Sequence, residues 1–384
     1  MIRKNTSSPI ALITILFLVL CFFVSYNSLQ VPEVISKPIS NEQFSASAAL
    51  LRLTDILPKD QQAHPVNSSA NELVRENIIS QLNELGLATE VQTTFSCANR
   101  RNSLNCAKVS NIISQIPGSD SSNTVLLTAH YDSVPAAQGA ADAGHAVAII
   151  LELLKHLKNQ STFKNDLIIL INEGEEAGLL GAEAFMAEHP LAKTVDVVIN
   201  LEARGNRGKS LLFETGEDNY RLIKLYQQFA KNPLSNSLTY EIYKLLPNDT
   251  DLTVFKGYGI SGINFAFQGR VTHYHTPLDN IANLSIGSVQ HQGENTYAML
   301  QALLSVDLES LPSGNAVYTD ILSSFMIVWP EHLTIPLTFM AVFLLLLIIW
   351  QLFKSERITQ LQLLYALPFA VVIVVLSALS CWAL

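Results

Sequence analysis

The sequence predicts an α/β protein, a three-layer α/β/α sandwich with a mixed, largely parallel sheet, joined to transmembrane helices. Three observations support this fold class. Short apolar runs with the length and β-branched content of buried strands alternate with segments of helical apolar spacing. Polar clusters follow several of these runs, as they do at the carboxyl ends of parallel strands. Long apolar runs with almost no charge lie near both ends of the chain.

The composition indicates a membrane protein. Of the 384 residues, 49% are hydrophobic and only 15% are charged, whereas soluble domains carry about 25% charged residues. The net charge of -9 argues against a nucleic-acid partner, which would need a basic surface.

Three apolar stretches predict membrane spans. Arg3 and Lys4 precede the first stretch, and we expect an uncleaved signal anchor over residues 10–26 rather than a secretory signal, because no small-residue cleavage site follows. Two further spans are predicted over 333–353 and 363–384. The N-terminus (1–9) and the basic loop (354–362) should share the cytoplasmic side, with residues 27 to about 330 on the opposite side.

The exported domain should face the periplasm from a bacterial inner membrane. A vacuolar or endoplasmic-reticulum membrane, with the domain in the lumen, is the alternative.

Between the spans, elements are expected in the following order. Residues 27–64 predict a linker and a helix over 44–57; a second helix over 70–85 starts at the N-cap pair Ser68-Ser69 and ends at Gly86. Strands over 91–95 and 109–116 flank a polar loop between Cys97 and Cys106, which in an exported domain either pair or remain free. Helices are then expected over 146–157 and after Leu179, and strands over 124–128, 167–171, 195–201, 210–214 and 262–267.

Several strand ends carry histidine and acidic side chains. The strand at 167–171 is followed by Glu173, Glu175 and Glu176, which repel one another unless a cation neutralises them. For this stretch alone, a solvated acidic turn is the alternative. The other strand ends and two loops add His130, Asp132, Asp142, Glu202 and His275. Imidazoles and carboxylates meeting at one edge of a sheet compose a metal site.

These segments resemble a known family. HYD followed by Asp142, then NEGEEAGLLGAEAF, NLEARG, NDTDLTVF and YHTPLDN, are similar to the co-catalytic zinc aminopeptidases and glutamate carboxypeptidases, family twenty-eight of the metallopeptidases. The likeness covers roughly residues 65–305, so we expect a zinc-exopeptidase-like domain over 65–310. The membrane arrangement resembles the branch that contains the vacuolar membrane protease and the endoplasmic-reticulum metallopeptidase.

The resemblance implies two Zn²⁺ ions per chain. Asp142 matches the carboxylate that bridges both ions. The full set of implied metal ligands is His130, Asp142, Glu176, Glu202 and His275. Each ion keeps an open position for water, which separates catalytic from structural zinc.

The resemblance also implies catalytic residues. Glu175 matches the general base that acts on metal-activated water, and Asp132 matches the residue that buttresses His130. Tyr274 is a candidate oxyanion donor, with packing in the pocket wall as its alternative.

Some positions depart from the family pattern or remain open. Where many relatives have an acidic residue or Asn after the bridging Asp, this chain has Ala143. We expect Asp142 to open a helix, His145 to lie on the surface of that helix, and His273 to point away from the site. Arg204 either binds a substrate carboxylate or forms a structural salt bridge. The segment with Asp249 and Asp251 matches a loop that lines the substrate pocket.

The sequence therefore predicts a membrane-anchored di-zinc exopeptidase, specifically an aminopeptidase, with peptides as substrates and membrane lipid around its spans. A carboxypeptidase or a glutaminyl-cyclase-like enzyme on the same fold is one alternative. A catalytically inactive, membrane-anchored binding domain is another, disfavoured because the ligand set and Glu175 are all present. The oligomeric state is left open.

Overall fold

The computed structural model describes residues 7–35, 43–60, 62–100, 103–120, 123–158, 163–308 and 310–383. The chain divides into two compact units, one ending at Trp329 and one beginning at Pro330. Arg3 and Lys4, on which the prediction of the cytoplasmic N-terminus partly depends, lie outside the described residues.

A seven-stranded sheet forms the centre of the first unit, in the order β1-β2-β4-β3-β5-β7-β6. The neighbouring strands β4, β3, β5 and β7 are parallel, while β1, β2 and β6 run antiparallel to their neighbours. The strand bounds are β1 (Thr89–Arg100), β2 (Ser103–Ile116), β3 (Thr124–His130), β4 (Asp166–Asn172), β5 (Val197–Ala203), β6 (Leu211–Thr215) and β7 (Ser261–Phe267). This mixed, largely parallel sheet confirms the predicted fold class.

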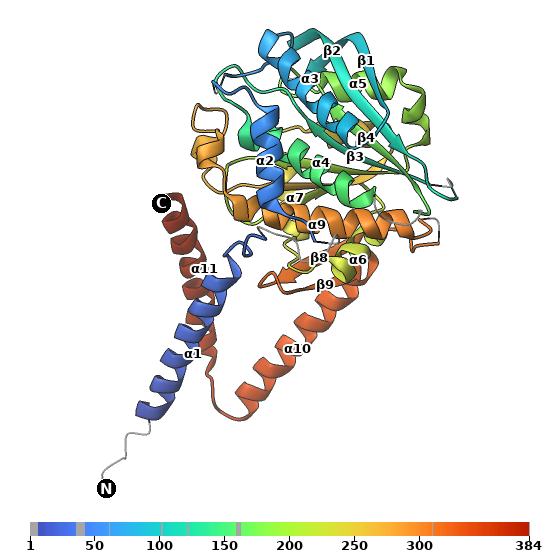
Figure 1. The fold of residues 1–384 in the computed structure, drawn as a ribbon. Coiled ribbons are helices and arrows are strands. Elements are labelled where there is room, and N and C mark those ends of the chain that lie inside the picture. Colours follow the sequence, from blue (N-terminus) through green and yellow to red (C-terminus); the bar gives the residue numbers. More distant parts are fainter. Residues whose placement is uncertain are drawn as a thin grey trace. The chain divides into compact units, whose positions relative to one another are not determined.

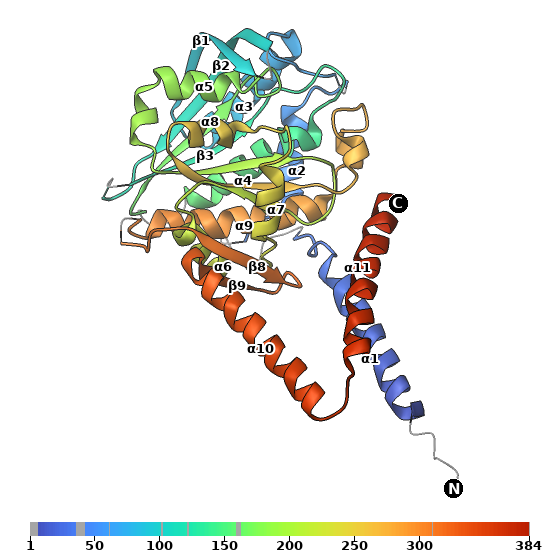
Figure 2. The ribbon, with the colours of Figure 1, turned by 180° about the vertical axis from the view of Figure 1, so that it is seen from behind.

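Helices cover both faces of the sheet, which completes the three layers (Figures 1 and 2). Alternate residues of β3 show the division: Val125 and Leu127 pack in the core on the side of α4, and Leu126 packs with α5 and α8. One side carries α2 (Ala46–Ile56), α4 (His145–Leu157), α6 (Tyr220–Phe229) and α9 (Ile286–Ser305); the other carries α5 (Leu180–Glu188) and α8 (Asp251–Gly257).

The remaining elements are shorter or peripheral. They are α3 (Ser69–Glu84), α7 (Ser237–Tyr243), η1 (Ala140–Gly144), η2 (Pro190–Thr194), η3 (Val271–His273), η4 (Ile281–Asn283), and the hairpin β8 (Ala316–Ile321) and β9 (Phe325–Pro330). Ser68 caps α3 by accepting a hydrogen bond from the Asn71 amide, as its sequence position predicts. The helix α2 packs on α4 and α9, so it is part of the compact unit.

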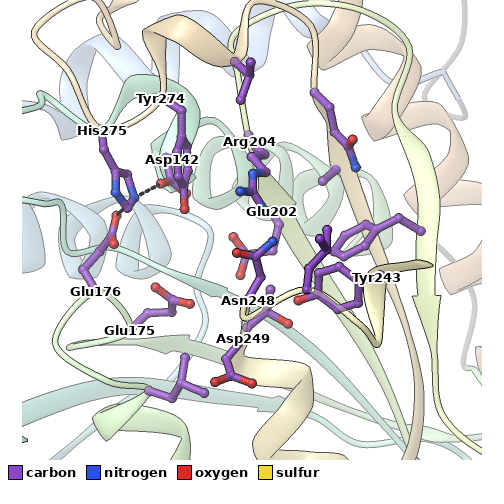
Figure 3. A pocket seen from close by; sticks show the side chains of 18 of the residues that line it. Asp142, Glu175, Glu176, Glu202, Arg204, Tyr243, Asn248, Asp249, Tyr274 and His275 are labelled. Carbon is purple, nitrogen blue, oxygen red and sulfur yellow. Dashed lines mark hydrogen bonds and ion pairs between the residues drawn. The ribbon is translucent and has the colours of Figure 1, made fainter. Parts of the chain in front are cut away.

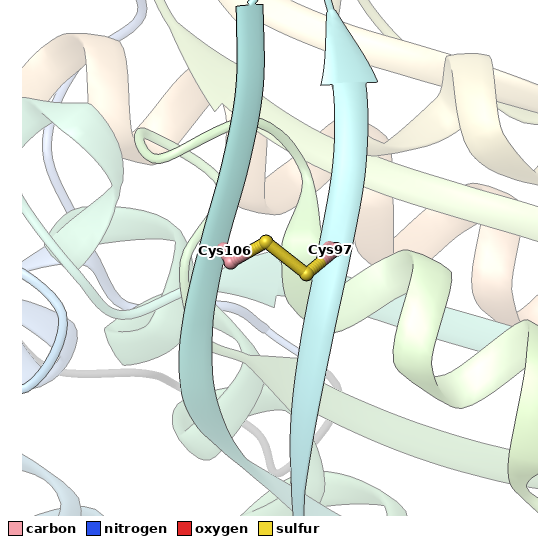
Figure 4. Close-up of a disulfide and its surroundings, with 2 residues drawn as sticks. All are labelled: Cys97 and Cys106. Atoms are coloured by element: carbon pink, nitrogen blue, oxygen red, sulfur yellow. A yellow bond between two sulfur atoms is a disulfide. The ribbon is translucent and has the colours of Figure 1, made fainter.

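The hairpin β1–β2 is longer than the sequence indicates. The segment expected as a polar loop continues the two strands, and Cys97 and Cys106 face each other in register, where they form a disulfide (Figure 4). Exposed and buried residues alternate along its outer part, so no continuous apolar run marks these strands in the sequence.

Three apolar helices are long enough to cross a membrane. They are α1 (Ser7–Ser28), α10 (Thr334–Lys354) and α11 (Gln360–Ala383), and a short turn, η5 (Glu331–Leu333), precedes α10. The candidate spans within them are 11–28, 331–354 and 360–377. Their bounds differ by a few residues from the predicted ones, and the helices fit a membrane protein.

Candidate metal centre

The parallel strands bring the predicted site residues to one edge of the sheet. His130 is the last residue of β3 and stands opposite Asn172, the last residue of β4. Glu202 lies near the end of β5, and the turn with Glu175 and Glu176 follows β4 directly. Strand register therefore explains why segments distant in sequence meet here.

His130, Asp142 and Glu202 form the first cluster. All three side chains are buried, and His130 Nε2 lies 3.4 Å from Asp142 Oδ1 and 3.7 Å from Glu202 Oε2. His130 Nδ1 is 3.0 Å from the main-chain oxygen of Asp132 and 3.6 Å from its Oδ1. These contacts fix the imidazole with Nε2 directed at the two carboxylates.

Asp142, Glu176 and His275 form the second cluster. His275 Nε2 lies 3.1 Å from both Asp142 Oδ2 and Glu176 Oε1 (Figure 3). Asp142 thus directs one carboxylate oxygen to each histidine. The two clusters share this one residue, as a pair of metal ions bridged by a carboxylate would require.

Asp142 lies in an extended segment of backbone, not at the start of a helix. Its φ of -112° and ψ of 92° are extended, and α4 begins three residues later, so the prediction that Asp142 opens a helix is wrong. The amides of Ala141 and Asp142 donate to the two carboxylate oxygens of Asp279, at 2.7 and 3.2 Å. Asp279 lies in the YHTPLDN segment, but the sequence gives no sign that it anchors the opposite loop.

Asp132 organises the acidic turn. Its carboxylate accepts hydrogen bonds from the amides of Gly174, Glu175 and Glu176 at 2.8, 3.1 and 3.2 Å. The side chain predicted to buttress His130 therefore also holds the loop that carries the other two acidic residues. The Asp132 carboxylate therefore links His130 to the turn that carries Glu175 and Glu176.

The electrostatics of the site favour a bound cation. Burial raises the pKa of Glu175 and Glu202, and it raises the pKa of Glu176 to about 8. For Asp142, the close contact with His130 and the hydrogen bond with His275 outweigh burial and hold its pKa below the usual range. A bound cation would offset the negative charge of these carboxylates.

The donor atoms fit zinc. His130 Nε2 and Glu176 Oε1 are buried and, beyond the ion-pair contacts described above, make no hydrogen bond. Buried polar atoms without a hydrogen bond are rare unless a ligand satisfies them. Imidazole nitrogen and carboxylate oxygen are ligands that zinc takes in catalytic sites. The residues present therefore suit two metal ions that share Asp142.

A cavity of about 800 Å³ opens beside the two clusters. Its lining includes Glu175, Tyr274, Arg204 and Asp249 (Figure 3). The Tyr274 ring stacks on the His275 imidazole, with 3.7 Å between ring centroids. A cavity of this size suits a small ligand or the end of a peptide.

Two neighbouring histidines lie apart from the clusters. His145 is fully buried, with Nε2 2.7 Å from Gln292 Oε1, so the expectation of a helix-surface residue is wrong. The cause is that α2, α9 and the sheet enclose α4. His273 contacts Asn206 Nδ2 through Nδ1 at 2.6 Å and belongs to neither cluster, in line with the expectation.

Of the two acidic residues expected in a pocket loop, Asp251 is buried and accepts a hydrogen bond from Asn172 Nδ2 at 2.6 Å. Asp249 is exposed and lines the cavity.

Solved structures share the fold of the domain. An aminopeptidase from Aneurinibacillus sp. strain AM-1 superposes with a TM-score of 0.57 at 12% identity, covering 71% of this chain and 97% of that one. A glutaminyl cyclase from Porphyromonas gingivalis superposes with a TM-score of 0.54 at 20% identity, covering 67% of this chain and 98% of that one. A Zn-dependent exopeptidase from Parabacteroides distasonis superposes with a TM-score of 0.52 at 18% identity, covering 67% of this chain and 98% of that one. The fold is that of the zinc exopeptidases.

The model of Peptidase family M28 matches residues 111–300 of this chain. A relative from Caenorhabditis elegans, putative endoplasmic reticulum metallopeptidase 1-B, is 29% identical over 96% of this chain and 44% of its own length. Human endoplasmic reticulum metallopeptidase 1 is 32% identical over 61% of this chain and 27% of its own length. The vacuolar membrane protease of Yarrowia lipolytica is 30% identical over 83% of this chain and 33% of its own length. The chain spans less than half the length of these relatives. These matches confirm the predicted resemblance and support a zinc peptidase.

Proposed function

We propose that this protein is a membrane-anchored di-zinc exopeptidase that removes residues from the N-terminus of peptides. The observation that carries the proposal is the pair of His/carboxylate clusters sharing Asp142. One ion would be held by His130, Glu202 and Asp142, and the other by His275, Glu176 and Asp142. Zinc bound there would lower the pKa of a coordinated water molecule and polarise the scissile carbonyl.

Glu175 is the proposed general base. It lines the cavity next to Glu176, and a hydrogen bond from its amide to Asp132 fixes its main chain at the edge of the cavity. Burial raises its pKa, which makes the carboxylate a better proton acceptor than one in water. It would take a proton from the attacking water and give it to the leaving amine.

Tyr274 is the proposed donor to the oxyanion. Burial raises the pKa of its phenol, so the hydroxyl keeps its proton at neutral pH. Its ring is fixed by stacking on His275, which holds the side chain at the cavity wall. A protonated, positioned hydroxyl can stabilise the charge that develops on the carbonyl oxygen.

The proposed membrane arrangement has residues 27 to about 330 outside the cytoplasm. The three apolar helices and the basic residues Lys354 and Arg357 between the last two support it. The relatives are named as endoplasmic-reticulum and vacuolar membrane proteins. A bacterial inner membrane with a periplasmic domain is the compartment that we propose; a vacuolar or endoplasmic-reticulum membrane is the alternative.

The test uses the full chain in detergent, stripped of metal and titrated with zinc. Products from a mixed library of unblocked peptides are followed by mass spectrometry, beside libraries blocked at either end. We expect about two zinc ions per chain, and loss of N-terminal residues only from peptides with a free amine. Glu175→Gln should bind zinc but lose activity, and the matched control Glu188→Gln, an exposed carboxylate on α5, should retain it.

Other outcomes would replace the proposal. Release of C-terminal residues would indicate a carboxypeptidase, and cyclisation of N-terminal glutamine would indicate a glutaminyl-cyclase-like enzyme. Two bound zinc ions without any reaction would favour a binding domain.

A further inference from the structure

Arg204 is a cation in the cavity that does not pair with the carboxylates of the two metal-binding clusters. Among the described residues that line the cavity, it is the only Lys or Arg. Within the described part of the chain, its guanidinium forms no ion pair, and it lies over the Tyr274 ring, 5.8 Å from the centroid. Arg204 therefore does not form the structural salt bridge that the sequence offered as one alternative.

Three of the carboxylates that line the same cavity as Arg204 are engaged with histidines. Glu202, two residues earlier, directs its carboxylate to His130, and Asp142 and Glu176 direct theirs to His275. Metal ions bound by these three residues would further reduce their negative charge. A half-buried guanidinium then remains facing the cavity with five N–H donors available.

The backbone around Arg204 is fixed by close packing. Its amide donates to the main-chain oxygen of Phe267 at 3.0 Å, and Gly269 exchanges main-chain hydrogen bonds with Arg207. A side chain at Gly205 would overlap the main-chain oxygen of Gly269, so only glycine allows this contact. The loop therefore sets the point from which the Arg204 side chain enters the cavity (Figure 3).

We propose that Arg204 forms an anion subsite that binds a carboxylate of the substrate beside the metal centre. The inference rests on the proposed peptidase function and narrows its substrate class to short peptides with a carboxylate near the scissile bond. A planar guanidinium pairs with a carboxylate through two parallel hydrogen bonds. The carboxylate comes either from the C-terminus of a di- or tripeptide or from an Asp or Glu side chain.

The first experiment compares kcat/KM for two substrate pairs with the zinc-loaded full chain. Leu-Ala is compared with Leu-Ala-amide, which tests the C-terminal source, and Leu-Asp-Ala-amide with Leu-Asn-Ala-amide, which tests the side-chain source. The wild type should prefer the carboxylate member of at least one pair by about 10- to 100-fold, as a hydrogen-bonded charge pair of about 1.5–3 kcal/mol would give.

Arg204→Gln should abolish that preference by lowering kcat/KM for the carboxylate member far more than for the neutral member, and Arg204→Lys should keep only part of it. The matched control Arg207→Gln removes the same charge from an exposed neighbour and should keep the preference. Equal treatment of both members by the wild type, or equal loss of both in Arg204→Gln, would overturn the subsite.

A second readout separates the subsite from the proposed reaction. Calorimetric binding of the same peptides to the zinc-loaded Glu175→Gln protein, with and without Arg204→Gln, measures recognition without turnover. Binding that depends on Arg204 and on the carboxylate would support the subsite even if the wild type cleaved none of the peptides, and the proposed function would then fail. Cleavage by the wild type with carboxylate-independent binding would leave the proposed function in place and overturn the subsite.

Discussion

Among single residues, His291 on α9 links the stability of the domain to pH. It is buried, its Nδ1 accepts a hydrogen bond from the Ser210 amide at 3.1 Å, and its Nε2 lies 3.0 Å from the main-chain oxygen of Asn232. Burial, together with the nearby Lys209, lowers the pKa of His291 to about 4 from an ordinary value of 6.5. The folded protein therefore keeps this imidazole neutral across mildly acidic pH.

The consequence is a loss of stability on acidification. As pH falls through 6.5 the unfolded chain takes up a proton at this site, whereas the folded chain does so only near pH 4. The contribution of His291 is thus complete above pH 6.5 and declines toward pH 4, by up to about 3 kcal/mol. His291→Gln should lower the thermal midpoint of the full chain in detergent at pH 7.5, and the difference from wild type should shrink as pH falls. An exposed control, His332→Gln, should follow the wild type, and parallel curves for His291→Gln would contradict the prediction.

Polar residues at strand ends, together with the resemblance to the family, singled out the side chains that the structure brings together. His130, Asp142, Glu176, Glu202 and His275 follow strand ends or lie in motif segments, where local order in the sequence already carries the information. The hydrogen bonds and packing that position these side chains could not be predicted in the same way. Asp279 reaches the amides of Ala141 and Asp142 from a distant part of the chain, and His145 is buried by helices whose packing the sequence does not display.

Among the elements, the segment from β4 to α5 determines the position of the acidic turn. Gly181, the second residue of α5, lies so close to the end of β4 that a side chain there would overlap the main-chain oxygen of Glu173 and crowd Asn111 Oδ1. The turn is also closed by a hydrogen bond from the Leu180 amide to the Gly174 oxygen at 3.0 Å. Strand, turn and helix therefore form one tightly packed unit that carries Glu175 and Glu176.

Gly181→Ala tests this unit. The added methyl group should push α5 away from β4, reduce stability by about 1–3 kcal/mol, and displace the two glutamates so that activity falls more than tenfold. Zinc content, thermal midpoint and peptide cleavage are measured on the same preparation. Gly257→Ala, on α8 with no heavy atom within 4 Å of the new methyl group, is the matched control and should leave all three unchanged. Full activity in Gly181→Ala would show that the turn tolerates movement of α5.

Element prediction succeeded where burial alone decides the pattern. The central strands β3, β4 and β5 are apolar runs covered on both faces, so their bounds shift by only one or two residues. The outer hairpin β1–β2 and the hairpin β8–β9 were missed in part or entirely, because partly exposed strands are stabilised by backbone pairing and, in the first case, by the disulfide.

At the scale of the whole molecule, three apolar helices, one before the peptidase domain and two after it, make a definite prediction about membrane sidedness. If all three span, the ends of the domain lie on one side. The end of α10, with Lys354, and the loop that follows it, with Arg357, lie on the other. In this arrangement, the substrates proposed above would reach the cavity only from the extracytoplasmic side.

Single cysteines labelled with a membrane-impermeant maleimide test this topology in the full chain. Cys21 and Cys381 are replaced by Ala, and the Cys97–Cys106 disulfide is kept because paired cysteines do not react. Lys59→Cys, on the exposed surface of the domain, should be labelled in sealed vesicles with the extracytoplasmic face outward, whereas Ser355→Cys should react only after permeabilisation. Labelling of both positions from the same face would mean that α10 does not span. Inverted vesicles must give the reverse pattern, since the two positions should lie on opposite faces of one bilayer.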